Sequence, residues 1–388
     1  ADRQARPSAL TLDGVEAKNL AGVLADDPLR AVQSLPGVSS NDDFDSRFSL
    51  RGAGFGRIGL YLDGILLHSP FHMVAGQTAT GTATAINNDL IDSLTLDSGS
   101  FPPRYGDRTA GVLAAETREG TRVAPAVRVT ASASNAGVVA EGPLGGGRRG
   151  SWLVGARKSY LQYIIRRTTS DSDPAFAFGI TDGHAKFAYD LSATHQITLS
   201  LMDGYSDLDR TGSASTFGVN TLTTSGYHLS LANLGWRYAP QDRFMATART
   251  AWMRERFENR NRDSQALQAG HYGEWVGQSQ VTWTFSRRAT LDAGGSARRL
   301  HDNGYENRYQ FNPAAVQRKE DYRGSAWRLG GFVQNSWNSA GGRVRLSAGA
   351  RWDRHSVSHI QTVSPPASAR LPRVRVRPRR GMPRGGRR

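Results

Sequence analysis

The feature that most constrains this chain is a strict two-residue alternation of apolar and polar side chains in its second half. The clearest case covers residues 343–352. Alternation with period two predicts a β-strand with one apolar and one polar face. A strand with arginines on its polar face fits a transmembrane β-barrel, whose outer face meets lipid and whose inner face meets water. Val344, Leu346, Ala348, Ala350 and Trp352 alternate here with Arg343, Arg345, Ser347, Gly349 and Arg351.

The same alternation recurs in four shorter stretches and predicts a chain that is mainly β. Between residues 126 and 356 we expect roughly ten antiparallel strands, with an eleventh starting near Val363. A soluble β-sandwich would alternate as well. Its strands average about five or six residues, however, whereas several stretches here could extend over about ten or more. The four stretches are residues 184–190, 197–201, 244–249 and 281–285.

One stretch breaks the alternation. Leu229 and Leu231 have one parity, whereas Leu234 and Trp236 have the other. An extra residue in a strand moves all later side chains to the opposite face. We therefore interpret residues 227–238 as a strand with a β-bulge.

The connections predicted between strands also indicate an outer-membrane barrel, because such barrels have short turns at one end and long loops at the other. Aromatic residues near strand ends suit the two membrane interfaces. The short connections are Ser192–Thr194, Pro240–Arg243, Ser286–Ala289 and Ala340–Gly342, and the long ones are Thr168–Ile180, Asp203–Ser225, Glu255–Glu274 and Asn303–Ser325. The aromatic residues are Trp152, Tyr160, Trp236, Tyr238, Trp252, Trp275, Trp327, Trp337 and Trp352.

Composition argues against several other classes of protein. No run of 18 or more apolar residues is present, so no transmembrane helix is predicted. The chain has no cysteine, which excludes disulfides and thiolate metal sites. Its net charge of +15 comes largely from residues 366–388, which hold nine Arg and no Asp, Glu or Lys. The remainder has 40 basic against 34 acidic residues and gives little support for nucleic-acid binding.

A glycine-rich stretch near the N-terminus has the letters of a nucleotide-binding motif but not its context. Gly54–Gly59 reads G-x-G-x-x-G, which needs a helix directly after it to hold pyrophosphate. Leu60–Leu62 alternates like a strand instead, and Asp63-Gly64 closes it with a turn. We therefore predict two short strands, around Phe48 and around Leu60, joined by a glycine-dense turn.

The segments on either side predict a small mixed α/β domain. Leu20–Leu35 is predicted as a helix, with Asp26 or Asp27 as its cap and Pro28 at its first position. Residues 1–18 are polar and weakly patterned. Two further short strands are expected at Ile91–Leu96 and Val112–Thr117.

Four landmarks in this region resemble the plug domain of TonB-dependent outer-membrane receptors. In order they are D-P-L-R-A-V-Q-S-L-P-G-V at 27–38, F-S-L-R-G-A-G at 48–54, L-Y-L-D-G at 60–64 and F-P-P-R-Y-G at 101–106. The resemblance implies a plug domain over residues 1–122 and an incomplete β-barrel of about ten strands over 123–364. Receptors of this family close their barrels with about 22 strands.

The resemblance also implies roles for particular residues. Those of the plug motifs are expected to be structural, with Arg104 in an ion pair inside the plug: Arg51, Gly52, Gly54, Asp63, Gly64, Arg104, Tyr105 and Gly106. Glu116, Arg118 and Glu119 are expected to face charges on the barrel wall. Near the outer apex of the plug, His68, Phe71 and His72 become candidates for contact with a ligand.

The two histidines stand at i and i+4, which is also the spacing of a metal-binding pair on a helix. Pro70 lies between them, no glutamate follows His68 as in H-E-x-x-H, and no third ligand is near, so we expect loop histidines and no metal site.

The sequence predicts a binding and gating protein without catalytic residues or cofactors, since no nucleophile–base pair, metal cluster or P-loop is found. By resemblance it would lie in the outer membrane of a Gram-negative bacterium, contact lipid and the TonB complex of the inner membrane, and import a siderophore, vitamin or glycan. We expect an incomplete receptor sequence, whose Arg/Pro/Gly-rich tail at 365–388 is non-native or disordered. The alternative is a soluble all-β binding or adhesion module with a basic tail.

Overall fold

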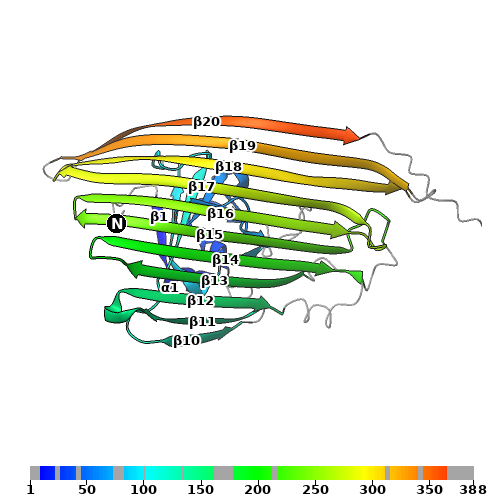
Figure 1. The fold of residues 1–388 in the computed structure, drawn as a ribbon, viewed down its shortest axis with the longest axis horizontal. Coiled ribbons are helices and arrows are strands. Elements are labelled where there is room, and N and C mark those ends of the chain that lie inside the picture. Colours follow the sequence, from blue (N-terminus) through cyan, green and yellow to red (C-terminus); the bar gives the residue numbers. More distant parts are fainter. Residues whose placement is uncertain are drawn as a thin grey trace, which may run out of the picture.

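The computed structural model describes residues 9–21, 27–40, 45–72, 83–99, 101–132, 135–160, 178–211, 217–310, 315–339 and 344–364. Within them the chain forms a five-stranded sheet near the N-terminus, followed by an eleven-stranded sheet (Figure 1). The fold class is mainly β, as predicted. The predicted tail at 365–388 lies outside the described residues.

The N-terminal part, which we call the plug, is a small α/β unit. Its sheet has the order β1-β8-β9-β4-β5, and β4 runs parallel to β9. Helices α1 and α2 pack on each other and on β8. Its elements are β1 (Ala9–Asp13), α1 (Gly14–Leu20), α2 (Pro28–Gln33), β2 (Val38–Ser40), β3 (Phe48–Leu50), η1 (Phe55–Arg57), β4 (Ile58–Leu62), β5 (Ile65–Leu66), β6 (Phe71–His72), β7 (Ala83–Thr84), η2 (Asn88–Leu90), β8 (Ile91–Ser98) and β9 (Gly111–Thr117).

The eleven-stranded sheet, which we call the wall, is a meander in which each strand pairs with the next along the chain. The order β10 to β20 does not return to its first strand, so within the described residues the wall is an open sheet. Its strands are β10 (Ala126–Ala131), β11 (Asn135–Leu144), β12 (Gly150–Ser159), β13 (Phe178–Asp190), β14 (His195–Asp209), β15 (Thr224–Gln241), β16 (Phe244–Arg260), β17 (Ala266–Ser286), β18 (Ala289–Gln310), β19 (Ala315–Asn338) and β20 (Arg345–Ser364), with a 3-10 turn, η3 (Gly146–Arg148), before β12.

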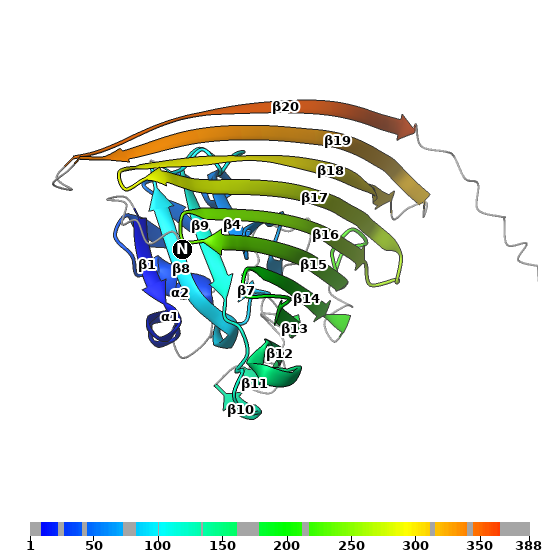
Figure 2. The ribbon, with the colours of Figure 1, turned by 60° about the vertical axis from the view of Figure 1, so that its left-hand side comes forward.

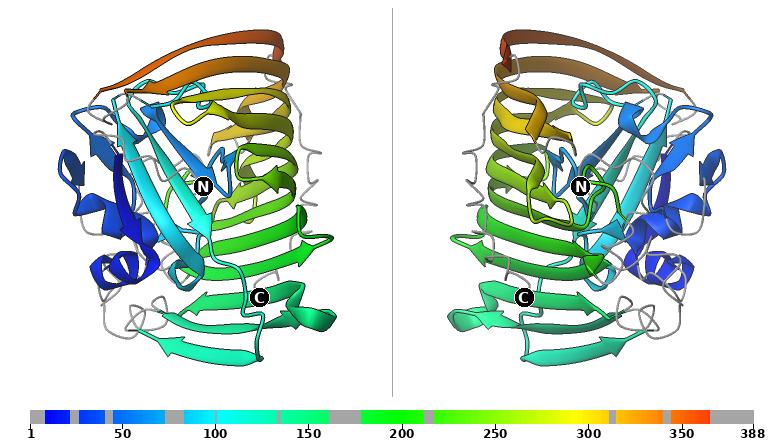
Figure 3. Two further views of the ribbon diagram at one scale, coloured as in Figure 1. Left: turned by 90° about the vertical axis from the view of Figure 1, so that its left-hand side faces the viewer. Right: turned by 90° about the vertical axis from the view of Figure 1, so that its right-hand side faces the viewer.

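The wall curves, and the plug sits on its concave side (Figures 2 and 3). One end of the wall has the connections after β13, β15 and β17, and we call it the turn end. The opposite end has the connections after β14 and β16, and we call it the loop end. The plug lies along part of the length of the wall, and the strands extend beyond it at the loop end (Figures 1 and 2).

The convex face of the wall is rich in exposed apolar side chains, as the alternation predicted. Trp236 on β15, Trp283 on β17 and Trp352 on β20 are 38%, 49% and 58% exposed, respectively. Single exposed apolar residues are common, but a face this broad marks a surface made for an apolar neighbour. Further members of this face are Leu234, Val281, Phe285, Val333, Trp337 and Leu346.

No helix in the described part of the chain is long and apolar enough to cross a membrane.

The helix prediction in the plug was partly wrong. The helix begins at Pro28, where Asp27 caps it by accepting a hydrogen bond from the Leu29 amide at 2.9 Å, but it ends at Gln33. A separate helix, α1, occupies Gly14–Leu20, where the polar sequence gave no periodic signal. Its start is fixed by a capping box of Asp13 and Glu16, a local device that needs no apolar face.

Two predictions about the wall were also wrong. The expected long loops at 203–225, 255–274 and 303–325 are in large part strand, since β14 reaches Asp209 and residues 261–265 alone separate β16 from β17. These segments are polar and pair through their backbones, so they lack the alternation of apolar side chains from which strands were predicted. The loop expected at 168–180 lies mostly outside the described residues.

The bulge expected between Tyr227 and Tyr238 is absent. Strand β15 keeps one register with β14 along this whole stretch. Leu229 and Leu231 are buried toward the plug, whereas Leu234 and Trp236 are on the convex face. The change of parity therefore does not come from an extra residue. It arises because the apolar side chains face the plug in one half of this stretch and lie on the convex face of the wall in the other half.

Candidate functional site

The candidate site is the contact between plug and wall, which begins with the turn that the L-Y-L-D-G motif forms. Asp63 and Gly64 have φ values of 46° and 79° and join β4 to β5 in a two-residue hairpin. Such hairpins favour Asp-Gly because both residues must adopt positive φ. The Asp63 carboxylate accepts hydrogen bonds from the Thr117 amide at 2.9 Å and from the Ser200 hydroxyl of the wall at 3.1 Å.

The wall holds this hairpin from three further strands. Lys186 on β13 lies 3.3 Å from the Asp63 carboxylate and donates to the Thr117 carbonyl at 2.6 Å. Asn233 on β15 donates to the Asp63 carbonyl at 3.4 Å, and Gln278 on β17 donates to the Gly64 carbonyl at 2.9 Å. The Asp63-Gly64 tip is therefore a point where the plug is attached to the wall.

The F-S-L-R-G-A-G motif has a purely internal role in the structure. Arg51 and Gly52 both have positive φ, at 50° and 80°. The Arg51 guanidinium donates to the Ser98 hydroxyl at 3.1 Å, inside the plug. Gly54 has negative φ and leads into η1 and then strand β4, so no helix follows the glycines. The context required for a dinucleotide site is missing, as predicted.

The F-P-P-R-Y-G motif forms a loop that touches the wall through its backbone. Arg104 donates to the Tyr105 hydroxyl at 3.0 Å and lies over the Tyr105 ring, 4.7 Å from its centroid. The Tyr61 hydroxyl lies 3.5 Å from the Gly106 carbonyl, and burial raises the pKa of Tyr61 to about 12. Arg351 on β20 donates to the carbonyls of Pro103 and Arg104 at 3.0 and 3.2 Å.

The residue after this motif, Asp107, was not singled out from the sequence. Its carboxylate lies 3.5 Å from Arg298, 3.8 Å from Arg328 and 3.7 Å from His355, which project from β18, β19 and β20. Arg298 also pairs with Glu274 on β17. These partners lie 191, 221 and 248 positions after Asp107, so the sequence held no signal for their meeting.

At the loop end, His68 contacts the wall. Its Nδ1 atom lies 3.0 Å from Glu255 Oε1, and its ring stacks on Tyr272 with centroids 3.9 Å apart. The Ser69 amide donates to the same carboxylate at 3.2 Å. Burial by itself lowers the pKa of His68, but the hydrogen bond and the negative charge of Glu255 outweigh burial and raise it.

Beside it, β6 and β7 meet the wall through a buried ionic cluster. His72 Nε2 lies 2.5 Å from Asp182 Oδ1, and Arg157 donates to Asp182 Oδ2 from Nε at 2.8 Å. Arg157 also donates to the Thr84 carbonyl at 2.7 Å, and His184 Nε2 lies 2.8 Å from the Ala85 carbonyl. His72 and Asp182 are 0% and 1% exposed. A buried charge is costly unless it is paired and hydrogen-bonded, as these are.

The three candidate ligand-contact residues therefore separate in the structure. Phe71 and His72 are buried in the plug–wall contact, whereas the His68 side chain is 48% exposed. His68 and His72 face different partners, Glu255 and Asp182. Among the described residues, no group of three or more metal-ligating side chains is arranged to hold an ion. Contact with a ligand stays a prediction for all three.

The residues at the end of the plug reach the wall in different ways. Arg118 donates to Glu141 of β11 at 2.6 Å, and Glu119 accepts from Gln196 of β14 at 3.3 Å. Partial removal from water, reinforced by the nearby Asp63 charge, raises the pKa of Glu116.

Apolar packing joins plug and wall as well. The main core of the plug includes Leu67 and Phe71, and it is continuous with buried wall side chains from β14 to β17. A smaller cluster joins Leu90 of the plug to Val139 and Leu153. The wall side chains in the main core are Met202, Tyr227, Leu229, Leu231, Ala251, Met253 and Val276.

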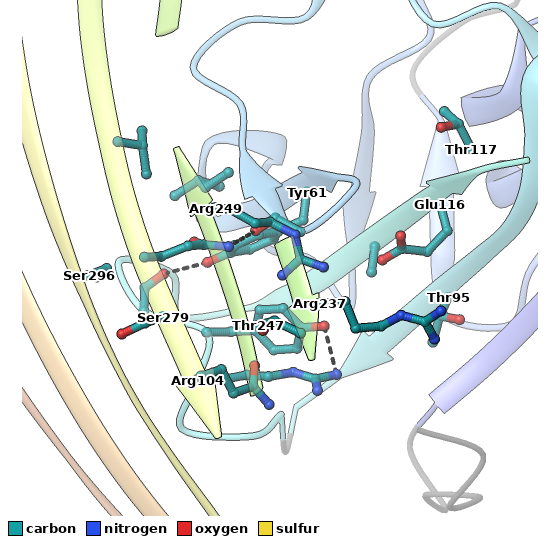
Figure 4. A pocket seen from close by; sticks show the side chains of 18 of the residues that line it. Tyr61, Thr95, Arg104, Glu116, Thr117, Arg237, Thr247, Arg249, Ser279 and Ser296 are labelled. Carbon is teal, nitrogen blue, oxygen red and sulfur yellow. Dashed lines mark hydrogen bonds between the residues drawn. The ribbon is translucent and has the colours of Figure 1, made fainter. Parts of the chain in front are cut away.

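Toward the turn end, the plug and wall separate and leave a cavity of about 1170 Å³. Strands β8 and β9 line it from the plug, and β15 to β18 line most of the wall side. Figure 4 shows Arg237, Arg249 and Thr247 reaching into this space from the wall, opposite Thr95 and Glu116 of the plug.

Comparisons with known proteins agree with this arrangement. Residues 4–113 match the family model described as TonB-dependent Receptor Plug Domain. No curated protein matches the sequence. Residues 4–113 are therefore similar to the plug domain of TonB-dependent receptors.

Solved structures share the fold over most of the chain. The ferric yersiniabactin uptake receptor FyuA from Yersinia pestis has a TM-score of 0.66 at 13% identity, over 92% of this chain and 60% of that one. The copper transporter OprC gives 0.66 at 16%, over 93% and 58%. The ferric-catecholate import receptor Fiu from E. coli K12 gives 0.65 at 11%, over 93% and 61%. The chain thus spans about three fifths of the length of these receptors and has their fold.

Proposed function

We propose that this chain acts as a TonB-dependent outer-membrane receptor, which binds a scarce solute and admits it to the periplasm. The observation that carries the proposal is the placement of a plug domain against the concave face of a wall whose convex face is apolar. An apolar outer face with a polar inner one fits a wall between lipid and water. The turn end would then face the periplasm, and the loop end the outside of a Gram-negative cell.

The plug supplies the gate in this proposal. It is attached to the wall by hydrogen bonds and ion pairs at separate points, including the Asp63 hairpin, Asp107, His68 and His72. Such contacts can be exchanged for contacts with water, whereas the apolar packing of the plug on the wall resists a shift. The TonB complex of the inner membrane is the proposed partner that moves it.

The solute is proposed from three classes: siderophore, vitamin or glycan. A metal-chelating siderophore ranks first, because the compared structures include receptors named for ferric yersiniabactin and ferric catecholates.

The test uses a Gram-negative host that expresses the chain, with and without its tonB gene. We expect the protein in the outer-membrane fraction after a high-salt wash, and accumulation of labelled iron–siderophore, cobalamin or oligosaccharide only when TonB is present. Accumulation that does not depend on TonB would contradict the proposal. A protein that stays in the soluble fraction would contradict it too, and would support the alternative of a soluble binding or adhesion module.

A further inference from the structure

The cavity at the turn end has an uneven charge distribution. Among its lining residues, seven side chains are cationic and four are acidic. Most of the cations are already paired with a carboxylate. Arg118 pairs with Glu141, Lys186 with Asp63, Arg298 with Glu274, and Arg351 with Asp353 at 2.6 Å.

Two of the lining arginines differ from these. Among the described residues, neither Arg237 nor Arg249 has an ion pair or a hydrogen-bonding partner. Both project from the concave face of neighbouring strands. Arg237 on β15 pairs in register with Thr247 on β16, so Arg249 is its diagonal neighbour. Such neighbours have Cα atoms about 7–8 Å apart, within reach of one multivalent ligand.

Glu116 interacts electrostatically with Arg249 and Asp190 with Arg237, but among the described residues neither carboxylate forms an ion pair with these arginines. Asp107 already meets Arg298, Arg328 and His355. Glu119 pairs with Arg122. The cavity therefore retains positive charge in a space partly enclosed by protein, where electrostatic attraction exceeds that in bulk water.

We propose that this cavity is an anion-binding site on the periplasmic side of the solute path, which takes a solute with several oxyanion groups and holds it through Arg237 and Arg249. The planar guanidinium group forms paired hydrogen bonds with carboxylate and phosphate oxygens, which suits it to this role. Thr247, Ser279 and Ser296, also on the cavity lining, add neutral hydroxyl donors. The inference rests on the proposed transport function and assigns the class of solute.

The experiment measures binding to the purified full chain in detergent micelles by titration calorimetry. The probes are citrate and inorganic pyrophosphate, with sorbitol as a neutral control of similar size. We expect both oxyanions to bind, sorbitol not to bind, and affinity to fall as salt rises. The anion that binds more tightly indicates whether the acid groups of the solute are carboxylates or phosphates.

Three variants make the test specific. Arg237→Gln and Arg249→Gln are each expected to weaken anion binding on the order of tenfold, the loss of about one charge-assisted hydrogen bond. The matched control is Arg256→Gln, on the convex face of the same strand as Arg249, and it should bind like the parent chain. Circular dichroism establishes that each variant is folded.

Two results would overturn the proposal: no anion binding by the folded parent chain, or equal binding by the parent and by the double variant of Arg237 and Arg249. The result of this binding experiment does not depend on the result of the transport experiment that tests the proposed function. Binding is measured without membranes or TonB, so a protein that fails to reach the outer membrane can still bind anions. Uptake of a neutral solute together with absent anion binding would overturn only this inference.

Discussion

The plug meets the wall differently at the two ends of the molecule. At the loop end the contact is closely packed, with a shared apolar core and a buried cluster in which Asp182 neutralises Arg157. At the turn end the surfaces separate around a cavity of about 1170 Å³, and two arginines there form no ion pair among the described residues. The packed contact at the loop end holds the plug in place. The cavity at the turn end provides space lined by an excess of positive charge.

The difference indicates which end resists movement. Apolar burial and paired buried charges cost free energy to break. Hydrated polar side chains around a cavity can be rearranged at lower cost. We therefore expect a plug that loosens first near the turn end and stays anchored near β6 and β7. Three changes test this comparison.

The largest effect is expected from Asp182→Ala at the loop end. Its removal leaves His72 and Arg157 buried without their counter-charge, which should cost about 3–5 kcal/mol of unfolding free energy. Thermal unfolding in micelles measures the loss. The control is Asp203→Ala, whose side chain is 59% exposed and pairs with His228, and it should cost less than about 1 kcal/mol. Equal losses would show that the buried cluster is not an anchor.

A somewhat smaller effect is expected from the apolar part of the same contact. Leu231 is 5% exposed and packs in the core shared with the plug, so Leu231→Ala should cost about 2–5 kcal/mol. The matched substitution is Leu234→Ala on the convex face of the same strand, where the side chain is 47% exposed. It should cost less than half as much in the same unfolding measurement. A greater loss at Leu234 would mean that the plug contributes little to the stability of this strand.

The smallest effect is expected from pH at His68. Because contact with Glu255 raises its folded pKa, the stabilisation is fully present below the ordinary value of about 6.5 and is lost as pH rises through the raised value. Hydrogen exchange of the amides at 67–72 should therefore be slower at pH 5.5 than at pH 8, after correction for intrinsic rates. His68→Gln should remove this dependence. Unchanged pH dependence in the variant would assign the effect to another group.

Much of the architecture could be predicted from local pattern. Strands β8 and β9, the Asp27 cap and the apolar convex face each depend on neighbours in sequence or on a two-residue period. The loop-end extensions of β14, β16 and β18 could not be predicted. Their side chains are largely polar, and the few apolar ones, such as Leu208 and Phe257, do not alternate along the strand, so the backbone pairing leaves little trace in side-chain hydropathy.

The candidate site divides in the same way. The sequence by itself determined the Asp63-Gly64 turn, because positive φ at two successive residues is a local demand, and it determined the polar inner face of the wall. Only the tertiary structure decided that Asp107 would meet three cations, that Asp182 would lie between His72 and Arg157, and that Arg237 and Arg249 would form no ion pair within the part of the chain that the structure describes. The reason is physical: electrostatic pairing depends on distance in space, and the curvature of the wall brings together residues that lie more than 100 positions apart in the chain.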